Sequence, residues 1–386
     1  MQVRSLELFD FRNYAQAQIE FHPGLTLLTG ANGQGKTNLI EAVGFASGTG
    51  SIRGAIDKSM VKDGCDAAVI RCETLVESRD CLIEARVQAS GRNQIQLNRQ
   101  RITRLGDLRE ALTTTVFSPD DLEIIKAGPV LRRDWIDEAC QSVDPTPQRS
   151  ELFTSLERIL RQRNTLLRQI SGRLDDTTTT TLDVWDAQLS EVGDQIRQIR
   201  TETLSSLEPY LQQNYASLAT AGAQVELRYE SSWDDEPLAA ALLKARQDDV
   251  RRAATTIGPH RDDVVIMLNG LPARTHASQG EQRSLALALR LATDAEVRAS
   301  RNINPVLLLD DVFSELDPQR AQGLLDALPS SQCIVTTASQ VPADAVIDQS
   351  WQITAGTITP ASPMSSTSPV VASMSSSPSS STLSRT

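Results

Sequence analysis

The chain has 386 residues, and its 49 acidic and 38 basic side chains give a formal net charge of −11. This balance excludes a uniformly basic surface for nucleic acid, although local arginine-rich patches remain compatible with it. No stretch approaches the roughly 20 apolar residues of a membrane span, and no signal-peptide pattern opens the chain. The five cysteines are odd in number and lack Cys-x-x-Cys spacing, which argues against a disulfide framework and a zinc site. We therefore expect a soluble, cytoplasmic protein.

The first strong signal is a glycine-rich loop near the N-terminus. Residues 25–29 form an apolar run typical of a buried strand, and a helix is expected over about 35–47. Between them lies a complete phosphate-binding motif, Gly30-Ala31-Asn32-Gly33-Gln34-Gly35-Lys36-Thr37. In such a loop, backbone N–H groups surround the α- and β-phosphates of a nucleotide, and the helix adds its positive dipole end. Lys36 is then expected at the β- and γ-phosphates, and the Thr37 hydroxyl on Mg²⁺.

The rest of the N-terminal region favours strands, and the middle of the chain favours helices. Apolar, β-rich runs predict strands at 68–72 and 81–87. We assign residues 1–110 to the first part of an α/β head domain, and residues 111–254 to a mainly helical lobe inserted into it.

Within this lobe, apolar residues recur at alternating spacings of four and three, as in a coiled-coil seam. The series is Trp185, Leu189, Val192, Ile196 and Ile199. A preceding helix that contains Leu156 and Ile170 is expected to pair with it antiparallel, with the turn at 175–181, where two aspartates precede five threonines. The pattern predicts a short coiled-coil-like hairpin, and an ordinary helical hairpin would give nearly the same pattern.

Residues 255–356 again show the strand and motif patterns expected of the head domain, and we assign them to its second part. Asn269-Gly270, between two apolar runs, predicts a β-hairpin. The apolar run 305–309 predicts a buried strand that ends in Asp310 and Asp311. We expect Asp310 to hold Mg²⁺ through water, and Asp311 to orient or deprotonate the attacking water. A core strand followed by a solvated acidic turn would give the same short string.

Two further strings flank this acidic pair. Ser278-Gln279-Gly280-Glu281-Gln282-Arg283 precedes an amphipathic helix, and Ser314-Glu315-Leu316-Asp317 follows the aspartates. Ser278 also suits a plain helix N-cap. With the phosphate loop, however, the strings resemble the signature motif and D-loop of ABC-type ATPases. The resemblance implies that Ser278 and Gly280 complete the γ-phosphate site of a second subunit, so that two ATP molecules lie in a homodimer interface.

Length separates the branches of this superfamily. Thr37 and Ser278 lie 241 positions apart, more than in a transporter ATPase subunit and far less than the arms of SMC or Rad50 proteins require. Several strings, in matching order, resemble the RecF branch over residues 1 to about 355. They are Leu8-Phe9-Asp10-Phe11-Arg12-Asn13-Tyr14, Phe117-Ser118-Pro119-Asp120-Asp121-Leu122, Gly128-Pro129 followed by Arg132-Arg133, and Gly258-Pro259-His260-Arg261-Asp262-Asp263.

The resemblance to this branch implies an ABC-type P-loop ATPase head with an inserted helical lobe. It also implies a weak ATPase, with Lys36 and Asp311 as candidate catalytic residues. ATP would close a dimer on duplex or gapped DNA to promote recombinase loading in DNA repair, recombination, replication and the SOS response, and slow hydrolysis would release it. RecR- and RecO-type proteins are the implied partners. The alternatives are an SMC-like head acting in chromosome organisation and, less well supported, a transporter ATPase subunit or a P-loop kinase.

The candidate DNA contacts are clustered arginines. They are Arg132, Arg133, Arg99 and Arg101. Arginines bind backbone phosphates without reading sequence, so we expect contact with the duplex backbone. A solvated charged face explains each cluster equally well.

Two regions depart from the ABC pattern. Thr337 or a neighbour stands where many of these ATPases have a histidine that senses the γ-phosphate, and no Q-loop glutamine is evident near 117–121. Residues 357–386 consist mainly of Ser, Thr and Pro with one charged side chain, so we expect a disordered tail.

Overall fold

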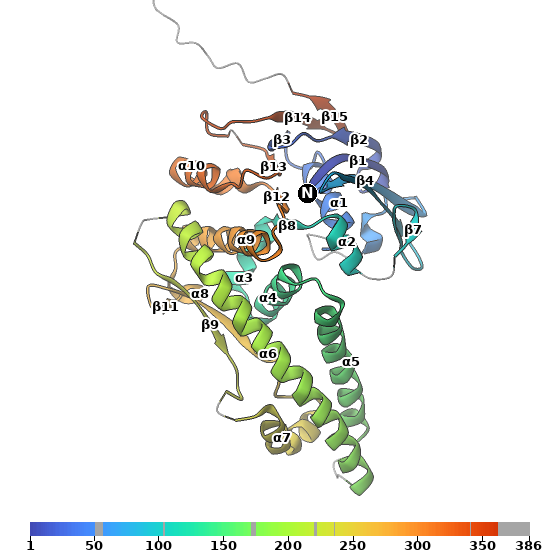
Figure 1. Cartoon of the computed structure of the whole chain (residues 1–386), viewed down its shortest axis with the longest axis vertical. Helices are drawn as coiled ribbons and strands as arrows, with labels where there is room; N and C mark the ends of the chain where they lie inside the picture. Colours follow the sequence, from blue (N-terminus) through green and yellow to red (C-terminus); the bar gives the residue numbers. More distant parts are fainter. Residues whose placement is uncertain are drawn as a thin grey trace, which may run out of the picture.

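The computed structural model describes residues 1–50, 57–102, 105–170, 175–219, 222–234, 236–339 and 341–361. Two sheets lie at one end of the molecule, and an arm of helices extends away from them (Figure 1). Segments from both ends of the chain contribute strands to these sheets, so the head is built from both ends. Among the described helices, none is long and apolar enough to cross a membrane.

The first sheet is antiparallel. Its strands are Gln2–Phe11 (β1), Tyr14–Glu20 (β2), Ala67–Val76 (β4), Arg79–Gln88 (β5), Gln94–Leu97 (β6) and Gln100–Arg101 (β7). Their order is β2-β1-β4-β5-β6-β7. In β4 every second residue from Ala68 to Thr74 is buried, as expected for a sheet with one face on the core.

The second sheet carries the phosphate loop. Its strands are Leu25–Thr29 (β3), Thr114–Phe117 (β8), Val306–Leu309 (β12), Cys333–Thr337 (β13), Gln349–Thr354 (β14) and Thr357–Pro360 (β15). They run in the order β15-β14-β3-β13-β12-β8, and only β15 is antiparallel to its neighbour. Strands β8, β12 and β13 are buried along their whole length. The carboxyl ends of the parallel strands meet at one edge, where ligands bind in open α/β sheets.

Helix α1 (Lys36–Ala46) lies between the two sheets. Its Leu39, Ile40 and Val43 share a core cluster with Leu6 of β1 and Leu308 of β12. Because α1 begins with Lys36 and Thr37, the last two residues of the phosphate-loop motif, its burial fixes the position of that loop. The short elements Asp57–Met60 (η1) and Leu105–Ala111 (α2) belong to the same half of the head.

Helices cover the other face of the second sheet and continue into the arm. They are Leu122–Lys126 (α3), Pro129–Val143 (α4), Pro147–Gln169 (α5), Asp176–Leu218 (α6), Leu238–Arg252 (α7), Ala273–His276 (α8), Gln279–Arg301 (α9) and Pro318–Ala327 (α10). The remaining elements are Pro119–Asp121 (η2), Val225–Glu230 (β9), Asp263–Leu268 (β10), Leu271–Pro272 (β11) and Val312–Glu315 (η3). Helix α6 runs from the tip of the arm to α9 and α10, so one rigid element links the arm to the head (Figure 1).

Some boundaries differ from those expected. The region expected to be mainly helical contains β8, which belongs to the second sheet of the head, and β9, which pairs with β10. Strand β15 occupies 357–360, where a disordered tail was expected to begin. Residues 362–386 of that expected tail lie outside the described residues. The hairpin predicted at Asn269-Gly270 is confirmed, since this turn joins β10 to β11.

Residues 176–181, predicted to belong to the turn between the arm helices, are instead part of α6. Asp175 is the N-cap of α6, and its carboxylate accepts a hydrogen bond from the Thr178 N–H at 2.7 Å. The Thr179 hydroxyl donates to the Asp175 carbonyl at 2.8 Å. The threonines therefore form the start of the helix, because a capping aspartate satisfies its first N–H groups. The predicted antiparallel pairing is confirmed, with α5 and α6 packed along each other (Figure 1).

Candidate nucleotide-binding site

Three segments from distant parts of the chain meet at the carboxyl edge of the second sheet. They surround a cavity of about 550 Å³. It is lined by Asn32, Gly33, Gly35, Lys36, Thr37, Asn38, Ser118, Pro119, Asp120, Asp310 and Asp311. The fold thus brings the predicted phosphate loop and the predicted acidic pair to one place, while Gly30, Ala31 and Gln34 of the loop lie outside this lining.

Asp310 contacts two hydroxyl groups. Thr37 Oγ1 donates to Asp310 Oδ1 at 2.8 Å, and Thr336 Oγ1 of β13 donates to the same oxygen at 2.6 Å. Hydroxyl and carboxylate oxygens are hard ligands, and Mg²⁺ usually combines one or two protein ligands with phosphate oxygens and waters. Thr37 and Asp310 therefore fit the expected Mg²⁺ site. Within the described ranges, no group of three or more His, Cys, Asp or Glu could hold a metal on its own, so the nucleotide would have to share the ion.

Thr336 was not among the site residues predicted from the sequence. The neighbouring Thr337, considered as a γ-phosphate sensor, instead donates from Oγ1 to the Ser339 carbonyl at 3.1 Å. Successive side chains on a strand point to opposite faces, so only one of the two threonines can reach Asp310. Alternate residues of strand 333–337 face opposite sides of the sheet. Knowing which of these residues lie on the same side as Asp310 would have distinguished Thr336 from Thr337.

The Lys36 side chain folds back over the loop. Its Nζ donates to the carbonyls of Gly30 and Ala31 at 2.7 and 2.9 Å. Burial lowers the pKa of the Lys36 ammonium, and the negative charges of Asp311 and Asp310 oppose this shift. Neutral carbonyls hold the ammonium in place without cancelling its charge, which suits an anionic phosphate.

Asp311 has a different environment from that of Asp310. It adopts a left-handed backbone, with φ 48°, at the start of η3. Its N–H donates to Thr336 Oγ1 at 2.9 Å, and its Oδ1 accepts from the Ala338 N–H at 3.4 Å. The two adjacent carboxylates thus have separate partners, although both face the cavity.

The segment after β8 forms the third wall. Asp121 Oδ2 accepts from the Ser118 N–H at 2.8 Å, and Asp121 Oδ1 accepts from Arg290 Nη2 at 2.8 Å. Arg290 belongs to α9, so this wall is tied to the helix that follows the signature-like motif. The segment lies where the sequence suggested looking for a Q-loop, and Asp120 faces the cavity there.

Ser278 caps helix α9. Its Oγ accepts from the Glu281 N–H at 3.4 Å, and the Glu281 carboxylate accepts from the Ser278 N–H at 2.7 Å. This capping box accounts for the local sequence. At Gly280 an added Cβ would lie 2.6 Å from Arg320 Nη1 of α10, a flexible side-chain end that could move aside. Neither Ser278 nor Gly280 lines this chain's own cavity, and their role in a second subunit stays a prediction.

The candidate DNA contacts fall into two groups. Arg132 donates from Nε and Nη2 to the Asp263 carboxylate at 2.7 and 2.8 Å, and its side chain is only 6% exposed. Because this pair occupies the guanidinium and ties α4 to β10, Arg132 is no longer a candidate for DNA phosphates. Arg133 is half-buried and donates to the Asp262 carbonyl at 2.6 Å. Arg99 and Arg101, beside the β6–β7 turn, are exposed.

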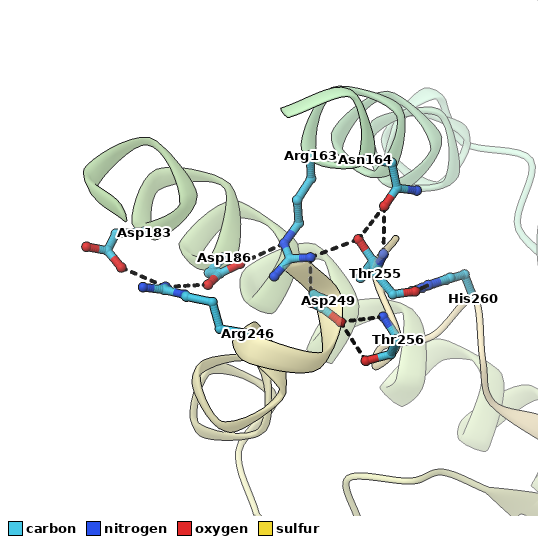
Figure 2. A network of polar contacts seen from close by, with 9 residues as sticks. All are labelled: Arg163, Asn164, Asp183, Asp186, Arg246, Asp249, Thr255, Thr256 and His260. Atoms are coloured by element: carbon cyan, nitrogen blue, oxygen red, sulfur yellow. Dashed lines mark hydrogen bonds and ion pairs between the residues drawn. The ribbon is translucent and has the colours of Figure 1, made fainter. Parts of the chain in front are cut away.

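A second group of buried charges lies in the arm (Figure 2). Arg163 of α5 donates to Asp186 of α6 at 2.8 Å and to Asp249 of α7 at 2.7 Å. Arg246 of α7 donates to Asp186 at 2.5 Å and to Asp183 at 2.7 Å. Two arginines pair with three aspartates here, and these ion pairs hold three helices together, so the network has the character of a structural cluster.

The phosphate loop lies between a sheet edge and a buried helix, and it faces Asp310, which directly follows β12. This is the arrangement of an ABC-type P-loop ATPase head. The sequence model of the RecF/RecN/SMC N-terminal domain matches residues 2–357. The chain belongs to the RecF family within this class. The DNA replication and repair protein RecF of Heliobacterium modesticaldum is 39% identical over 347 residues, which cover 87% of this chain and 92% of that protein. The RecF of Streptomyces avermitilis is 38% identical over 354 residues, covering 88% and 94%.

Solved structures agree with the fold. The recombination mediator protein RecF, solved with ATP, matches with a TM-score of 0.84 and 29% identity, covering 93% of this chain and 97% of that one. An SMC head bound to the winged-helix domain of ScpA matches with a TM-score of 0.56 at 19% identity, covering 93% and 96%, and shows a shared fold alone. The family and the fold class predicted from the sequence are confirmed.

Proposed function

We propose that this chain is an ATP-dependent DNA-binding protein of recombinational repair and replication, with weak ATPase activity. The contact between Thr37 and Asp310 carries the proposal: at 2.8 Å it joins two halves of a nucleotide site that lie 273 positions apart. Membership of a family with a member solved with ATP supports the same assignment.

Each side chain then has a distinct task. Lys36 binds the β- and γ-phosphates, while Thr37 and Asp310 hold the Mg²⁺ that the nucleotide brings, and that ion supplies charge stabilisation for phosphoryl transfer. Asp311 orients the attacking water. Hydrolysis is expected to be slow, because β13 ends in Thr336 and Thr337, where many ABC-type ATPases have a histidine that can take up a proton. ATP therefore acts mainly as a switch.

ATP binding closes a homodimer in this proposal. Ser278 and Gly280 of one subunit face the γ-phosphate held by the other, where a serine hydroxyl and the α9 N-terminus suit an anion. Arg99, Arg101 and Arg133 are the remaining candidates for contact with duplex or gapped DNA. In the cytoplasm the closed dimer would load recombinase together with RecR- and RecO-type partners.

The test is the mass of the protein in solution, measured by analytical ultracentrifugation with ADP, with ATP, and with ATP plus a gapped duplex. We expect monomer with ADP, dimer with ATP, and dimer on DNA in the third condition. Ser278→Arg should bind ATP yet remain a monomer, whereas Ser300→Arg, at the exposed far end of the same helix, should dimerise normally. Equal masses with ADP and ATP would refute the switch.

The alternatives have less support. SMC heads resemble the chain at a TM-score of 0.56, against 0.84 for the RecF structure. The long insertion between phosphate loop and signature, which forms α5–α7, argues against a transporter ATPase subunit.

A further inference from the structure

Gln34 of the phosphate loop is held from outside by two turns that belong to opposite ends of the chain. Its side-chain Oε1 accepts from the Ala355 N–H at 2.6 Å, and its main-chain carbonyl accepts from the Gly356 N–H at 3.2 Å. The same carbonyl accepts from Asn13 Nδ2 at 3.0 Å. Ala355 and Gly356 form the β14–β15 turn, and Asn13 lies in the β1–β2 turn.

The β14–β15 turn has a strained geometry that suits this contact. It is a two-residue loop between the paired residues Thr354 and Thr357, with φ 47° at Ala355 and φ 76° at Gly356. Positive φ at both positions defines the hairpin turn usually made by Asn-Gly, and alanine adopts this conformation only at a steric cost. Both central N–H groups of such a turn point away from the hairpin. Here both donate to Gln34.

The β1–β2 turn makes further contacts with the phosphate loop. Asn13 also accepts from Asn38 Nδ2 of α1 at 2.7 Å, and the buried Tyr14 hydroxyl donates to the Gly35 carbonyl at 3.0 Å. An added Cβ on Gly35 would lie 2.7 Å from both the Asn13 amide and the Tyr14 hydroxyl. The loop is therefore in close contact with Asn13 and Tyr14, neither of which lines the cavity.

These contacts fix the orientation of one peptide plane. In a trans peptide the C=O and the following N–H point in opposite directions. Two donors hold the Gln34 carbonyl outward, so the Gly35 N–H is directed the other way, and Gly35 lines the cavity. Backbone N–H groups at this point of the loop are the ones that bind the α- and β-phosphates.

We propose that Gln34 is a positioning residue, and that the β14–β15 turn and Asn13 form a clasp that orients the Gly35 N–H for phosphate. The inference rests on the proposed nucleotide binding and deepens it. It makes the last described strands of the chain part of the nucleotide site, although none of their residues lines the cavity.

The test compares Gln34→Met with Gln352→Met. The first variant keeps side-chain length but removes the acceptor for Ala355. The second removes the hydrogen bond from Thr29 Oγ1 to Gln352 Oε1, at 2.9 Å, which links β3 to β14 without involving Gln34. Calorimetric titration with ATP and with ADP, both with Mg²⁺, should show about three- to tenfold weaker binding of both nucleotides by Gln34→Met only. Asn13→Ala, at an exposed position, should behave like Gln34→Met.

Turnover separates positioning from general destabilisation. At saturating ATP, Gln34→Met should keep the parental kcat within about twofold while KM rises, and its Tm should stay within a few degrees. Parental affinity in both Gln34→Met and Asn13→Ala would overturn the clasp, as would an equal loss in Gln352→Met. A parental protein that binds no ATP would refute the proposed function itself, which is a distinguishable result.

Discussion

The nucleotide cavity and the arm both bury charged side chains, but they arrange them differently. In the arm, Arg163 and Asp249 have fully buried side chains and contact each other at 2.7 Å. In the head, Lys36 donates to two carbonyls, and Asp310 accepts from two hydroxyls. Carbonyls and hydroxyls satisfy hydrogen bonds without cancelling charge.

This difference separates a cluster that stabilises from a site that binds. Opposite charges that neutralise each other leave little for a ligand, and removing one of them leaves its partner buried and uncompensated. Charges held by neutral groups retain their field in the cavity, at some cost in stability. Substitutions in the arm should therefore change the free energy of unfolding, and substitutions in the cavity should change nucleotide chemistry.

The largest effect is expected at Asp311. Asp311→Asn keeps the hydrogen-bonding shape and tolerates the left-handed backbone that aspartate adopts there. It loses the charge that orients or accepts the proton of the attacking water, so ATP hydrolysis should fall by about 10²–10⁴-fold. Measured by phosphate release and by sedimentation, the variant should be a slow ATPase that accumulates as an ATP-bound dimer.

Asp310→Asn provides the contrast. It should also weaken Mg²⁺-dependent ATP binding, since its carboxylate is the expected metal ligand. Asp326→Asn, on an exposed part of α10, should leave both properties unchanged. Hydrolysis by Asp311→Asn at the parental rate would show that the roles of the two aspartates are misassigned.

The arm should respond in the opposite way. Arg163→Met removes the arginine that pairs with the buried Asp249 and leaves Asp186 still paired with Arg246, so the free energy of unfolding should drop by about 3–5 kcal/mol, mainly through Asp249. Arg158→Met is the matched control on the same helix, because its side chain is 64% exposed and lies 3.9 Å from Glu151. There we expect at most about 0.5 kcal/mol. Chemical denaturation measures both, and ATP affinity of the folded Arg163→Met protein should be parental.

The same comparison explains what could be predicted from the sequence. The phosphate loop is specified by adjacent residues, and β3 and α1 begin and end within one or two residues of their predicted bounds. The Asn-Gly hairpin is also local. Arg132 looked like an exposed DNA contact, because its partner Asp263 lies 131 positions away and nothing in the neighbouring residues indicates the pair.

Other contacts were hidden for the same reason. Thr336 reaches Asp310 only because β12 and β13 pair in parallel with a particular register. The hydrogen bond that the Gln34 side chain accepts comes from Ala355, in a turn 321 positions further along the chain. Tertiary partners of this kind decide which of several similar polar residues enters the site, and a single sequence does not record them.

At Lys36, binding and stability should separate clearly. Lys36→Ala removes the cation expected at the β- and γ-phosphates, a charge-assisted contact of about 1.5–3 kcal/mol. ATP affinity should therefore fall at least about tenfold. The Tm should change little, because water can hydrate the loop carbonyls of Gly30 and Ala31 that lose the ammonium. Lys244→Ala, which removes an exposed ion pair with Glu236, should leave affinity unchanged. Unaltered ATP affinity in Lys36→Ala would contradict the phosphate-loop assignment.

The smallest effect is expected at the edge of the arm network and depends on pH. His260 lies beside Thr255 (Figure 2), and its Nε2–H donates to the Thr255 carbonyl at 3.1 Å. Its Nδ1 has no hydrogen-bond partner among the described residues. Burial lowers the pKa of His260 from 6.5 to about 4, and the nearby cations Arg261, Arg133 and Arg163 act in the same direction. The folded protein therefore holds this imidazole neutral.

His260→Gln tests that state while keeping a donor for the Thr255 carbonyl. Because the unfolded chain takes up the proton more readily, the stability contributed by neutral His260 is complete above about pH 6.5 and is lost as the pH falls towards 4. Between pH 7 and pH 5 the parental protein should lose about 2 kcal/mol that the variant does not lose. Urea unfolding across this range measures the difference, with His276→Gln, at an exposed position, as the control that keeps the parental slope. If His260→Gln and the parental protein lose stability in parallel, the folded protein does not hold His260 neutral, and burial at the edge of the arm network does not shift its pKa.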